Sequence, residues 1–542
     1  MGMGCMRATR REGLLLLVIA LACFSGCAPK LKILKPSEQI TLDRAIVEAP
    51  AGFDLKLLAS GLTAPAAIDF DDDGNLLVAE NGRDNDEPHI FGIRPNRTMF
   101  QIYPMPRRVP LLGAFKPEFK IHGPIGGIAA WQGQLFVTHR DDKARGAVTR
   151  FGYDGSHRTV VADLPAAGDY GMTDIAVRKI DGRLFFGLGT ATNSGVVGLD
   201  NWNWVREHAN FADRPYLEVK LNGYKFFTPN PDAGLFGGPD VAITAPFHAF
   251  GKSNQSRIRG SKKPTGAIYS IGPDGGDLTV EAWGIRMPRG LAFNQYGRLY
   301  ATNNGMELRG TRPVKDDPDA LVRILSGTWL GWPDFSTDLY SISDPRFQPP
   351  SWMVGKYGYD ENSPVIDLGA SNPQSRGLKP PDINRDLLLQ AVFPPLAGAA
   401  KMAFAPATGP FRDFQGSAFI ALWGDRAPFA TSGQKMIGPT GYKVVRVQVD
   451  ERKVSDFVYN TRGGPASKLA LGRDQIGLER PIDVKFGPDG AMYILDYGKL
   501  VMKDGKEKVT RGSGKIFRLV PVGNQPATQS LPAAMTQPTT GE

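Results

Sequence analysis

Cysteine is almost absent from this chain, and its placement excludes several kinds of chemistry. The 542 residues include only three cysteines, at positions 5, 23 and 27. Residues 28–542 therefore offer no disulfide, no thiolate metal site, no cysteine nucleophile and no covalent haem attachment motif. Any catalytic or binding site in this part must be built from other side chains.

The chain also has little in the way of long hydrophobic runs. The N-terminal apolar run from Leu14 to Cys23 follows Arg7, Arg10 and Arg11 and is too short to cross a bilayer comfortably. This order of charged, apolar and small residues is typical of a secretory signal. We therefore predict that residues 1–26 are a signal peptide and that the protein is exported.

The sequence Phe24-Ser25-Gly26-Cys27 resembles a bacterial lipobox, although Phe24 stands where Leu is usual. Leu21-Ala22-Cys23 is a weaker competitor. The resemblance predicts lipidation of Cys27 and a membrane-anchored protein of the cell envelope or periplasm. The alternatives are a plain cleaved signal or an uncleaved anchor.

Basic runs and basic-aromatic platforms are missing as well. The formal net charge is +9, but the charges are dispersed, which argues against a nucleic-acid partner. Residues 27–50 are predicted to be a tether. Residues 521–542 are rich in Pro, Thr, Gln and Ala and are predicted to form a disordered tail.

What the chain has in abundance is a repeated hairpin pattern. Six segments consist of an apolar strand, a tight turn containing glycine and a second apolar strand. With 64 Gly and 43 Pro, the pattern predicts an all-β, six-bladed β-propeller of four-stranded antiparallel blades over residues 51–520. A β-sandwich, or two unrelated β-domains, is the alternative. The innermost strands are expected near residues 66–70, 126–130, 174–177, 290–293, 401–404 and 482–486.

Propeller geometry predicts which polar residues meet. The start of each inner strand and the loop after the second strand share one face around the central channel, here called the mouth. This places several cations at the mouth, where converging charges would attract a small polyanion. The starts supply His122, Asp169, Tyr170, Arg286, Arg289, Lys401 and Arg480, and the loops supply Glu80, Asn81, His139, Arg140, Asn193, Asn303, Asn304, Asp425, Arg426, Asp496 and Tyr497.

Three stretches carry a resemblance to a known family. They are GIRMPRGLAFNQYGRLYATNNG from Gly284 followed by GTWLGWPDF, the loop GLGTATNSGVV from Gly187, and RPIDVKFGPDGAMYILDYG from Arg480. Together they resemble the glucose/sorbosone dehydrogenase family, six-bladed propellers that hold pyrroloquinoline quinone (PQQ) with calcium and oxidise sugars. The similarity runs roughly over residues 51–520.

The resemblance implies PQQ and Ca²⁺ as cofactors, a sugar or polyol as substrate, and an unnamed electron acceptor. By motif, Asn193 resembles the family's cofactor-contacting Asn. Geometry places Arg286, Lys401 and Arg480 as further cofactor-binding residues, because guanidinium and ammonium groups suit the three carboxylates of the quinone. Asn304 and Glu307 are candidate calcium ligands.

The sequence departs from the family at the catalytic base. The family's Asp-His pair is replaced by Asp169-Tyr170, and a tyrosine with an ordinary pKa near 10 is a poor base at neutral pH unless cations lower that value. The candidate catalytic residues are therefore Tyr170, Asp169 and His122, with His139 as another possible replacement. Thr192 also stands where the family has an Arg.

Three functions remain open from the sequence. The first is a membrane-anchored, PQQ-dependent sugar dehydrogenase. The second is a surface-tethered binding propeller without catalysis, which the tyrosine at the base position would suit. The third is a gluconolactonase-type hydrolase, in which Glu80, Asn193, Asp425 or Asp496 would bind a divalent metal through oxygen atoms.

Overall fold

The computed structural model describes residues 31–523, except 83–86, 105–118, 222–224, 232, 234–239, 255, 352–365, 368–383, 427–438, 473–474 and 504–505. Cys27, the predicted signal peptide and residues 524–542 of the predicted tail lie outside the described residues. Across the described part, no helix has the length and apolar character needed to cross a membrane.

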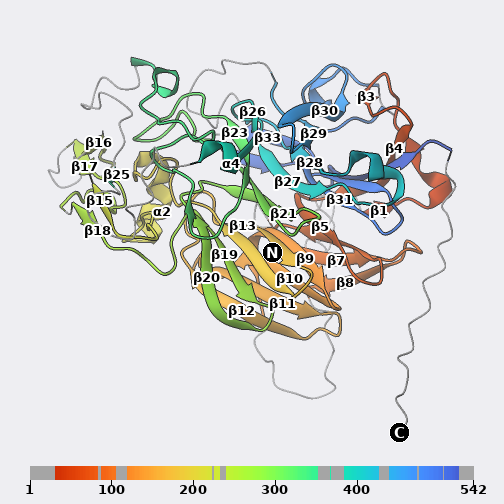
Figure 1. The fold of residues 1–542 in the computed structure, drawn as a ribbon, viewed down its shortest axis with the longest axis horizontal. Coiled ribbons are helices and arrows are strands. Elements are labelled where there is room, and N and C mark those ends of the chain that lie inside the picture. Colours follow the sequence, from red (N-terminus) through yellow and green to blue (C-terminus); the bar gives the residue numbers. More distant parts are fainter. Residues whose placement is uncertain are drawn as a thin grey trace, which may run out of the picture.

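The prediction of a six-bladed all-β propeller is confirmed (Figure 1). The innermost strands contact one another in a closed ring, in the order β5, β9, β13, β21, β27, β31 and back to β5. All six lie where the hairpin pattern predicts them. They span Pro65–Phe70, His122–Trp131, Met172–Arg178, Pro288–Phe293, Ala399–Phe404 and Pro481–Phe486.

Each inner strand begins an antiparallel blade of at least four strands. The first blade continues with β6 (Leu76–Glu80), β7 (His89–Ile93) and β8 (Met99–Tyr103), the second with β10 (Gln134–Arg140), β11 (Gly146–Gly152) and β12 (His157–Leu164), and the third with β14 (Arg183–Leu188), β19 (Ala267–Gly272) and β20 (Gly275–Trp283). The fourth continues with β22 (Leu299–Asn303), β23 (Asp319–Arg323) and β26 (Leu389–Phe393), the fifth with β28 (Ser417–Leu422), β29 (Lys443–Gln448) and β30 (Lys453–Asn460), and the sixth with β32 (Met492–Asp496) and β35 (Gly514–Pro521).

The first strand of the propeller closes the ring. Strand β4 (Phe53–Leu62) is the outer strand of the sixth blade and pairs with β35 from Gly514↔Leu62 to Pro521↔Phe53. The N-terminal and C-terminal parts of the propeller therefore lie side by side, as the red and blue ribbons in Figure 1 show. The segment predicted to be a tether also pairs with the blades, through β1 (Lys32–Ile33) and β2 (Ile40–Thr41) on β4 and β3 (Val47–Glu48) on β30.

Small residues and buried aspartates let the six inner strands converge. A Cβ at Gly126 would lie 2.3 Å from the carbonyl oxygen of Thr173, and one at Gly290 would lie 2.3 Å from that of Ala400. Asp174 accepts a hydrogen bond from the backbone N–H of Leu291 on the next inner strand, at 2.9 Å. Asp69 and Asp483 make the same kind of contact to neighbouring inner strands. Each of these buried carboxylates thereby satisfies a backbone donor and ties two blades together.

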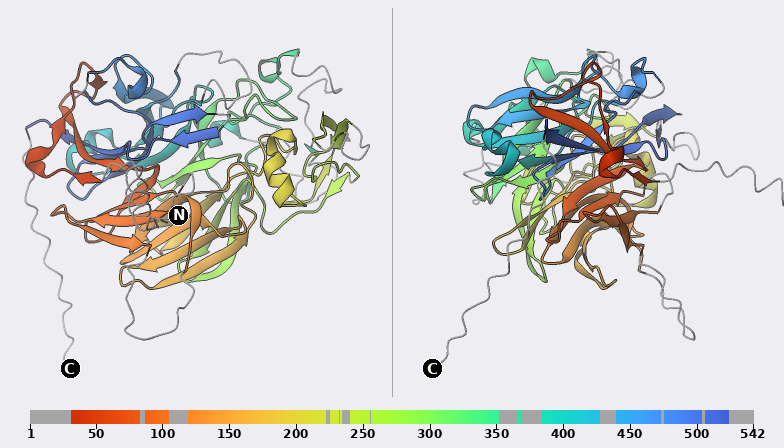
Figure 2. Two further views of the ribbon diagram at one scale, coloured as in Figure 1. Left: turned by 180° about the vertical axis from the view of Figure 1, so that it is seen from behind. Right: turned by 90° about the vertical axis from the view of Figure 1, so that its right-hand side faces the viewer.

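The two long intervals of the hairpin pattern are insertions. The first, between β14 and β19, holds α2 (Trp202–Glu207), β15 (Val219–Leu221), β16 (Phe226–Pro229), β17 (Val241–Thr244) and β18 (Arg257–Ile258). The second, between β23 and β26, holds β24 (Thr328–Trp329), β25 (Ile366–Asp367) and α4 (Arg385–Leu388). Strand β15 pairs with both β18 and β25, so the insertions meet in one small sheet. Figure 2 shows α2 and the strands of the first insertion to one side of the blades.

Candidate functional site at the propeller mouth

Four of the predicted catalytic and cofactor-binding residues meet at the mouth of the propeller. Asp169 and Tyr170 precede β13, Asn193 lies in the loop after β14, and Arg286 precedes β21. These segments come together because the start of an inner strand and the loop after the second strand lie on the same face of a propeller. The described structure places all four side chains in one network of hydrogen bonds.

Arg286 is the buried centre of this network. Its Nη2 donates to the hydroxyl of Tyr170 and, at 2.8 Å, to Oδ1 of Asn193. Its other nitrogens donate to the backbone oxygens of Asn193 and Asn304, at 3.1 and 3.2 Å. Its guanidinium carbon also lies 4.2 Å from the centre of the Tyr170 ring. Arg286 therefore orients the loops of two blades.

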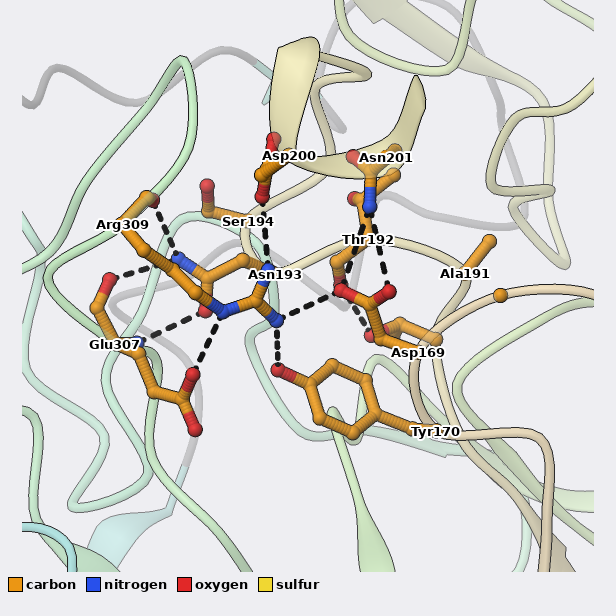
Figure 3. Close-up of polar contacts among 12 residues, drawn as sticks. Asp169, Tyr170, Ala191, Thr192, Asn193, Ser194, Asp200, Asn201, Glu307 and Arg309 are labelled. Atoms are coloured by element: carbon orange, nitrogen blue, oxygen red, sulfur yellow. Dashed lines mark hydrogen bonds and ion pairs between the residues drawn. The ribbon is translucent and has the colours of Figure 1, made fainter. Parts of the chain in front are cut away.

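A second arginine, Arg309, joins the same network from the loop between β22 and β23 (Figure 3). It donates to Asp169 at 2.7 Å, to the Tyr170 hydroxyl at 2.6 Å, to Asp200 at 2.8 Å and to Glu307 at 2.7 Å. Asn193 joins the network as well, because its Oδ1 accepts from the backbone N–H of Glu307 at 2.9 Å. Arg309 and Asp200 belong to no sequence motif, and sequence reasoning missed both. We call Asp169, Tyr170, Asp200, Glu307 and Arg309 the Arg309 cluster.

Burial and the two arginines set the acidities in this cluster. Burial raises the pKa of Tyr170 to about 12, although Arg286 and Arg309 oppose the shift. Burial also raises the pKa of Asp200 to about 6. Glu307 behaves differently: burial acts to raise its pKa, but Arg309, Arg286 and Arg426 together bring it down to about 2. At neutral pH, Tyr170 is therefore a neutral phenol and Glu307 an ionised carboxylate, so neither suits proton abstraction.

Beside the Arg309 cluster lies a small cleft of about 40 Å³, enough for about three water molecules or one carboxylate group. It is called the mouth cleft here. Tyr170, Arg286 and Glu307 form one part of its wall, and Arg289, Trp423 and Arg426 form another. The cleft also contains Asn304, Asp319 and Asp425 among its lining residues.

The part of the cleft lining formed by Arg289, Trp423 and Arg426, here called the tryptophan wall, carries cationic donors. The guanidinium carbons of Arg289 and Arg426 lie 5.0 and 5.4 Å from the centre of the Trp423 ring. Arg426 also pairs with Glu507 at 2.9 Å and remains partly exposed. The indole Nε1 of Trp423 is buried and has no hydrogen-bond partner within the described part of the chain. Two guanidinium groups and an unused N–H thus offer donors to an anionic ligand.

One carboxyl group in the mouth cleft has an acidity close to neutrality. Burial raises the pKa of Asp319 to about 6, against the lowering effect of hydrogen bonds from the backbone. Those bonds come from the N–H groups of Gly305 at 3.0 Å and Ala399 at 2.8 Å. Asp319 was not among the predicted site residues, because it begins a strand, β23, that the hairpin pattern does not mark.

Five predicted site residues do not line the mouth cleft. Asp169 and Asn193 belong to the hydrogen-bond network beside it, and the other three lie elsewhere. Lys401 lies deeper in the channel, where its Nζ is 3.2 Å from Asp174 and donates to the backbone oxygen of Gly126 at 2.6 Å. Arg480 is buried against Trp423, and its Nη1 donates to three consecutive backbone oxygens, those of Trp423, Gly424 and Asp425. His122 is exposed at the start of β9. Sequence position alone does not give the depth of a side chain in the channel.

The predicted calcium ligands do not fit a metal in this arrangement. Glu307 pairs with Arg309 at 2.7 Å and lies 3.7 Å from Arg286, so a cation would compete with two guanidinium groups. Asn304 donates its side-chain N–H to the backbone oxygen of Ala399 at 2.8 Å. Among the described residues, no three His, Cys, Asp or Glu side chains form a group that could hold a metal ion.

The metal ligands considered for a hydrolase bind protein groups instead. Glu80 accepts from the backbone N–H of Thr63, and Asp425 accepts from that of Thr440. Asp496 accepts from the backbone N–H groups of Glu479, Arg480 and Gly498. Burial raises the pKa of Asp496, against these bonds. These three carboxylates lie in three different blades, and each accepts hydrogen bonds from its own backbone groups.

Comparisons with known proteins give structural matches only. No protein-family model matches the chain, and no curated protein matches it. The PQQ domain of pyranose dehydrogenase from Coprinopsis cinerea is 14% identical, with a TM-score of 0.48, over 88% of this chain and 98% of that one. The PQQ-bound aldose sugar dehydrogenase from Streptomyces coelicolor is 15% identical, with a TM-score of 0.43, over 87% and 99% of the two chains.

A putative gluconolactonase structure is also similar, at 11% identity and a TM-score of 0.35, over 91% of this chain and 98% of that one. At these identities and TM-scores, the matches assign neither a family nor an activity to this chain. The fold is established by the strand order and the closed ring of inner strands, and the function must be argued from the mouth.

Proposed function

We propose that this protein is a sugar or polyol dehydrogenase that uses PQQ bound at the propeller mouth. The observation that carries the proposal is the mouth cleft, which has room for a carboxylate and is lined by Arg286, Arg289 and Arg426. The sequence resemblance to glucose/sorbosone dehydrogenases supports the same assignment.

The residues of the tryptophan wall fit the quinone. Arg289 and Arg426 would pair with its carboxylates, and the free indole N–H of Trp423 would donate to one of its oxygens. Bound PQQ would supply the hydride acceptor for oxidation of the sugar. The cleft also contains Glu307, Asp319 and Asp425, so carboxylates balance its positive charges. We therefore expect the affinity for PQQ to depend on the individual contacts of Arg289 and Arg426.

We propose that Asp319 accepts the proton, because it lines the mouth cleft. A general base works best when its pKa lies near the operating pH, and the pKa of Asp319 is about 6. Tyr170, with a pKa of about 12, and Asp169, which is paired with Arg309 at 2.7 Å, are left with positioning roles. His122 is exposed and outside the cleft lining.

Dye-linked turnover tests the dehydrogenase assignment. The full chain, purified in detergent and incubated with PQQ and calcium chloride, should reduce an artificial dye when aldoses and polyols are supplied. The rate should rise through about pH 6 and then level off, because Asp319 must be ionised to accept a proton. Asp319→Asn should remove turnover while leaving PQQ binding intact, and the exposed-site control Lys453→Gln should retain both. A Tyr170→Phe variant that loses turnover while Asp319→Asn keeps it would move the base to Tyr170.

A non-catalytic binding propeller is the second candidate. It is favoured by the Tyr170 hydroxyl, which accepts hydrogen bonds from both Arg286 and Arg309 at the position where the resembling family has a basic histidine. PQQ binding without oxidation of any sugar would support this candidate and overturn the dehydrogenase.

We also propose that Cys27 carries a lipid that anchors the protein to a membrane of the cell envelope. The proposal rests on the order of charged, apolar and small residues before Cys27. Export would place the mouth where sugars outside the cytoplasm are accessible. The electron acceptor would then be a component of the same compartment.

A further inference from the structure

The part of the first insertion that carries β15 to β18 is more basic than the rest of the chain. Residues 214–263 contain eight Lys or Arg and three Asp or Glu. This segment carries β15 to β18 and stands to one side of the blades in Figures 1 and 2. It contributes none of the residues that line the mouth cleft.

Two adjoining hollows form a groove beside this insertion. One has a volume of about 370 Å³ and the other about 290 Å³, and they share Asn210, Ala212 and Arg214. Ligand sites for small molecules commonly begin at about 300 Å³. We call the two together the Arg214 groove. Its length, with Arg214 between the two hollows, suits a ligand of several connected units.

Three cations of the groove are available to a ligand. Arg214, Lys252 and Arg259 line the larger hollow and are exposed. In the described part of the chain none of the three forms an ion pair, whereas nearby Arg257 pairs with Glu218 at 3.4 Å. Unpaired cations that share a concave surface raise the local concentration of anions.

The single acid in the lining of the larger hollow is already used inside the protein. Asp213 accepts hydrogen bonds from the backbone N–H groups of Ala191 and Thr192, at 2.6 and 3.0 Å. It also accepts from the hydroxyls of Thr192 and Thr265, at 2.6 and 2.7 Å. These bonds fix the backbone beside Arg214, so the groove is held in place before any ligand arrives.

The remaining lining combines apolar and hydrogen-bonding groups. Phe247, Pro215 and Ile258 supply apolar surface, and Asn254 and Ser261 supply an amide and a hydroxyl. Sugar rings bury their C–H faces on apolar surface while their hydroxyls seek amides and hydroxyls. The unpaired cations add a preference for ligands that carry acidic groups.

We infer that the Arg214 groove binds an anionic oligosaccharide, one whose rings carry carboxylates or sulfate esters. This site is separate from the mouth cleft and does not depend on the proposed redox activity. It would hold the protein on an acidic polysaccharide. Carboxylate and sulfate groups present similar anionic oxygens to Arg214, Lys252 and Arg259. A binding experiment with both kinds of ligand must therefore show which of the two is preferred.

Calorimetric titration of the full chain in detergent tests the inference. The probes are tetragalacturonate, a sulfated galactan tetrasaccharide and, as the neutral control, maltotetraose. At least one anionic probe should bind, and maltotetraose should bind at least tenfold more weakly. Arg214→Gln and Arg259→Gln should each raise the Kd of the anionic probe roughly tenfold, the scale expected for a lost charge-assisted hydrogen bond.

Lys453→Gln removes an exposed cation from another blade and should leave the Kd unchanged. Because Arg259 is exposed, its substitution should not disturb folding, which circular dichroism checks. The preferred probe identifies the anionic group as carboxylate or sulfate. The inference is overturned if neither anionic probe binds, if maltotetraose binds equally well, or if Arg289→Gln in the mouth cleft, rather than Arg214→Gln, removes binding.

Discussion

Replacing Arg309 with methionine should destabilise the protein in a pH-dependent way. The substitution keeps much of the side-chain length and removes the charge that pairs with Asp169, Asp200 and Glu307 at 2.7 to 2.8 Å. Three carboxylates would then share a largely buried space without their common cation. Buried charges left without a partner are among the few causes of large single-site losses of stability.

Two quantities bear on the size of the loss. Removing one member of a buried ion pair costs about 3–5 kcal/mol, and the lower end applies because Arg309 is still 13% exposed and Glu307 14%. The pKa of Glu307 is held at about 2, against its usual 4.5. That difference corresponds to about 3 kcal/mol of stability, which Arg309 shares with Arg286 and Arg426. We expect a loss of about 3 kcal/mol at pH 8.

Urea unfolding followed by tryptophan fluorescence measures the loss at pH 8 and at pH 5. At pH 5 the loss should be smaller by about 1 kcal/mol or more, because Asp200, with a pKa of about 6 even beside Arg309, is already protonated there. Arg309→Met combined with Glu307→Gln should recover part of the stability, because one uncompensated charge is removed.

Arg412→Met provides the matched control. Arg412 makes one ion pair, with Asp413 at 3.5 Å, and its side chain is 73% exposed. Its loss should change stability by no more than about 0.5 kcal/mol. The reasoning about the Arg309 cluster is refuted if Arg309→Met costs no more than this control, or if its cost is the same at both pH values.

Further predictions concern other groups. Burial raises the pKa of Asp213 to about 6 and that of Asp317 to about 7. Because both values lie above the usual 3.8, the stability that these two groups contribute is full below about pH 4 and is lost as the pH rises through 6 to 7. A wild-type free energy of unfolding that increases from pH 4.5 to 7.5 would contradict this argument. Lys401→Met should cost about 3–5 kcal/mol, because it leaves Asp174 buried without its partner at 3.2 Å, and a double-mutant cycle in which adding Asp174→Asn restores nothing would count against this. Cys27→Ser should leave the protein unprocessed or move it out of the membrane fraction, and an intact mass showing an unmodified wild-type cysteine would end the anchoring proposal.

The propeller could be predicted from the sequence because its signals are local. A short turn with glycine between two apolar strands marks five of the inner hairpins, and the pattern places all six inner strands. In the fifth blade a longer connection, which holds η6 (Gly409–Phe414), joins β27 to β28. The pairing of β4 with β35 was not evident, since it joins residues that lie more than 450 positions apart. Strand β23 was also missed, because its partner β26 follows a long insertion instead of a short turn.

The candidate site was only partly predictable. Propeller geometry placed Asp169, Tyr170, Asn193 and Arg286 at one mouth, because each is next to an inner hairpin. Arg309 lies in an irregular loop and is 140 residues from Asp169, so no local pattern could reveal that pair.

The acidities of the mouth could not be read from the sequence either. The sequence suggested that cations could lower the pKa of Tyr170, but burial outweighs both arginines and raises it to about 12. The mouth was also expected to be strongly cationic. Its arginines prove to be matched by Asp169, Asp200 and Glu307, and these matches depend on how loops from different blades fold together.

Calorimetric titration of PQQ into the full chain, in the presence of calcium, tests the central claim that this cofactor binds at the propeller mouth with a carboxylate in the mouth cleft. We predict binding at one site per chain, weakened by about 1.5–3 kcal/mol in Arg426→Gln and in Arg289→Gln, the range for a lost hydrogen bond to a charged group. Lys453→Gln should bind PQQ as the wild type does. The absence of any binding heat, or an affinity that neither arginine substitution changes, would contradict the claim.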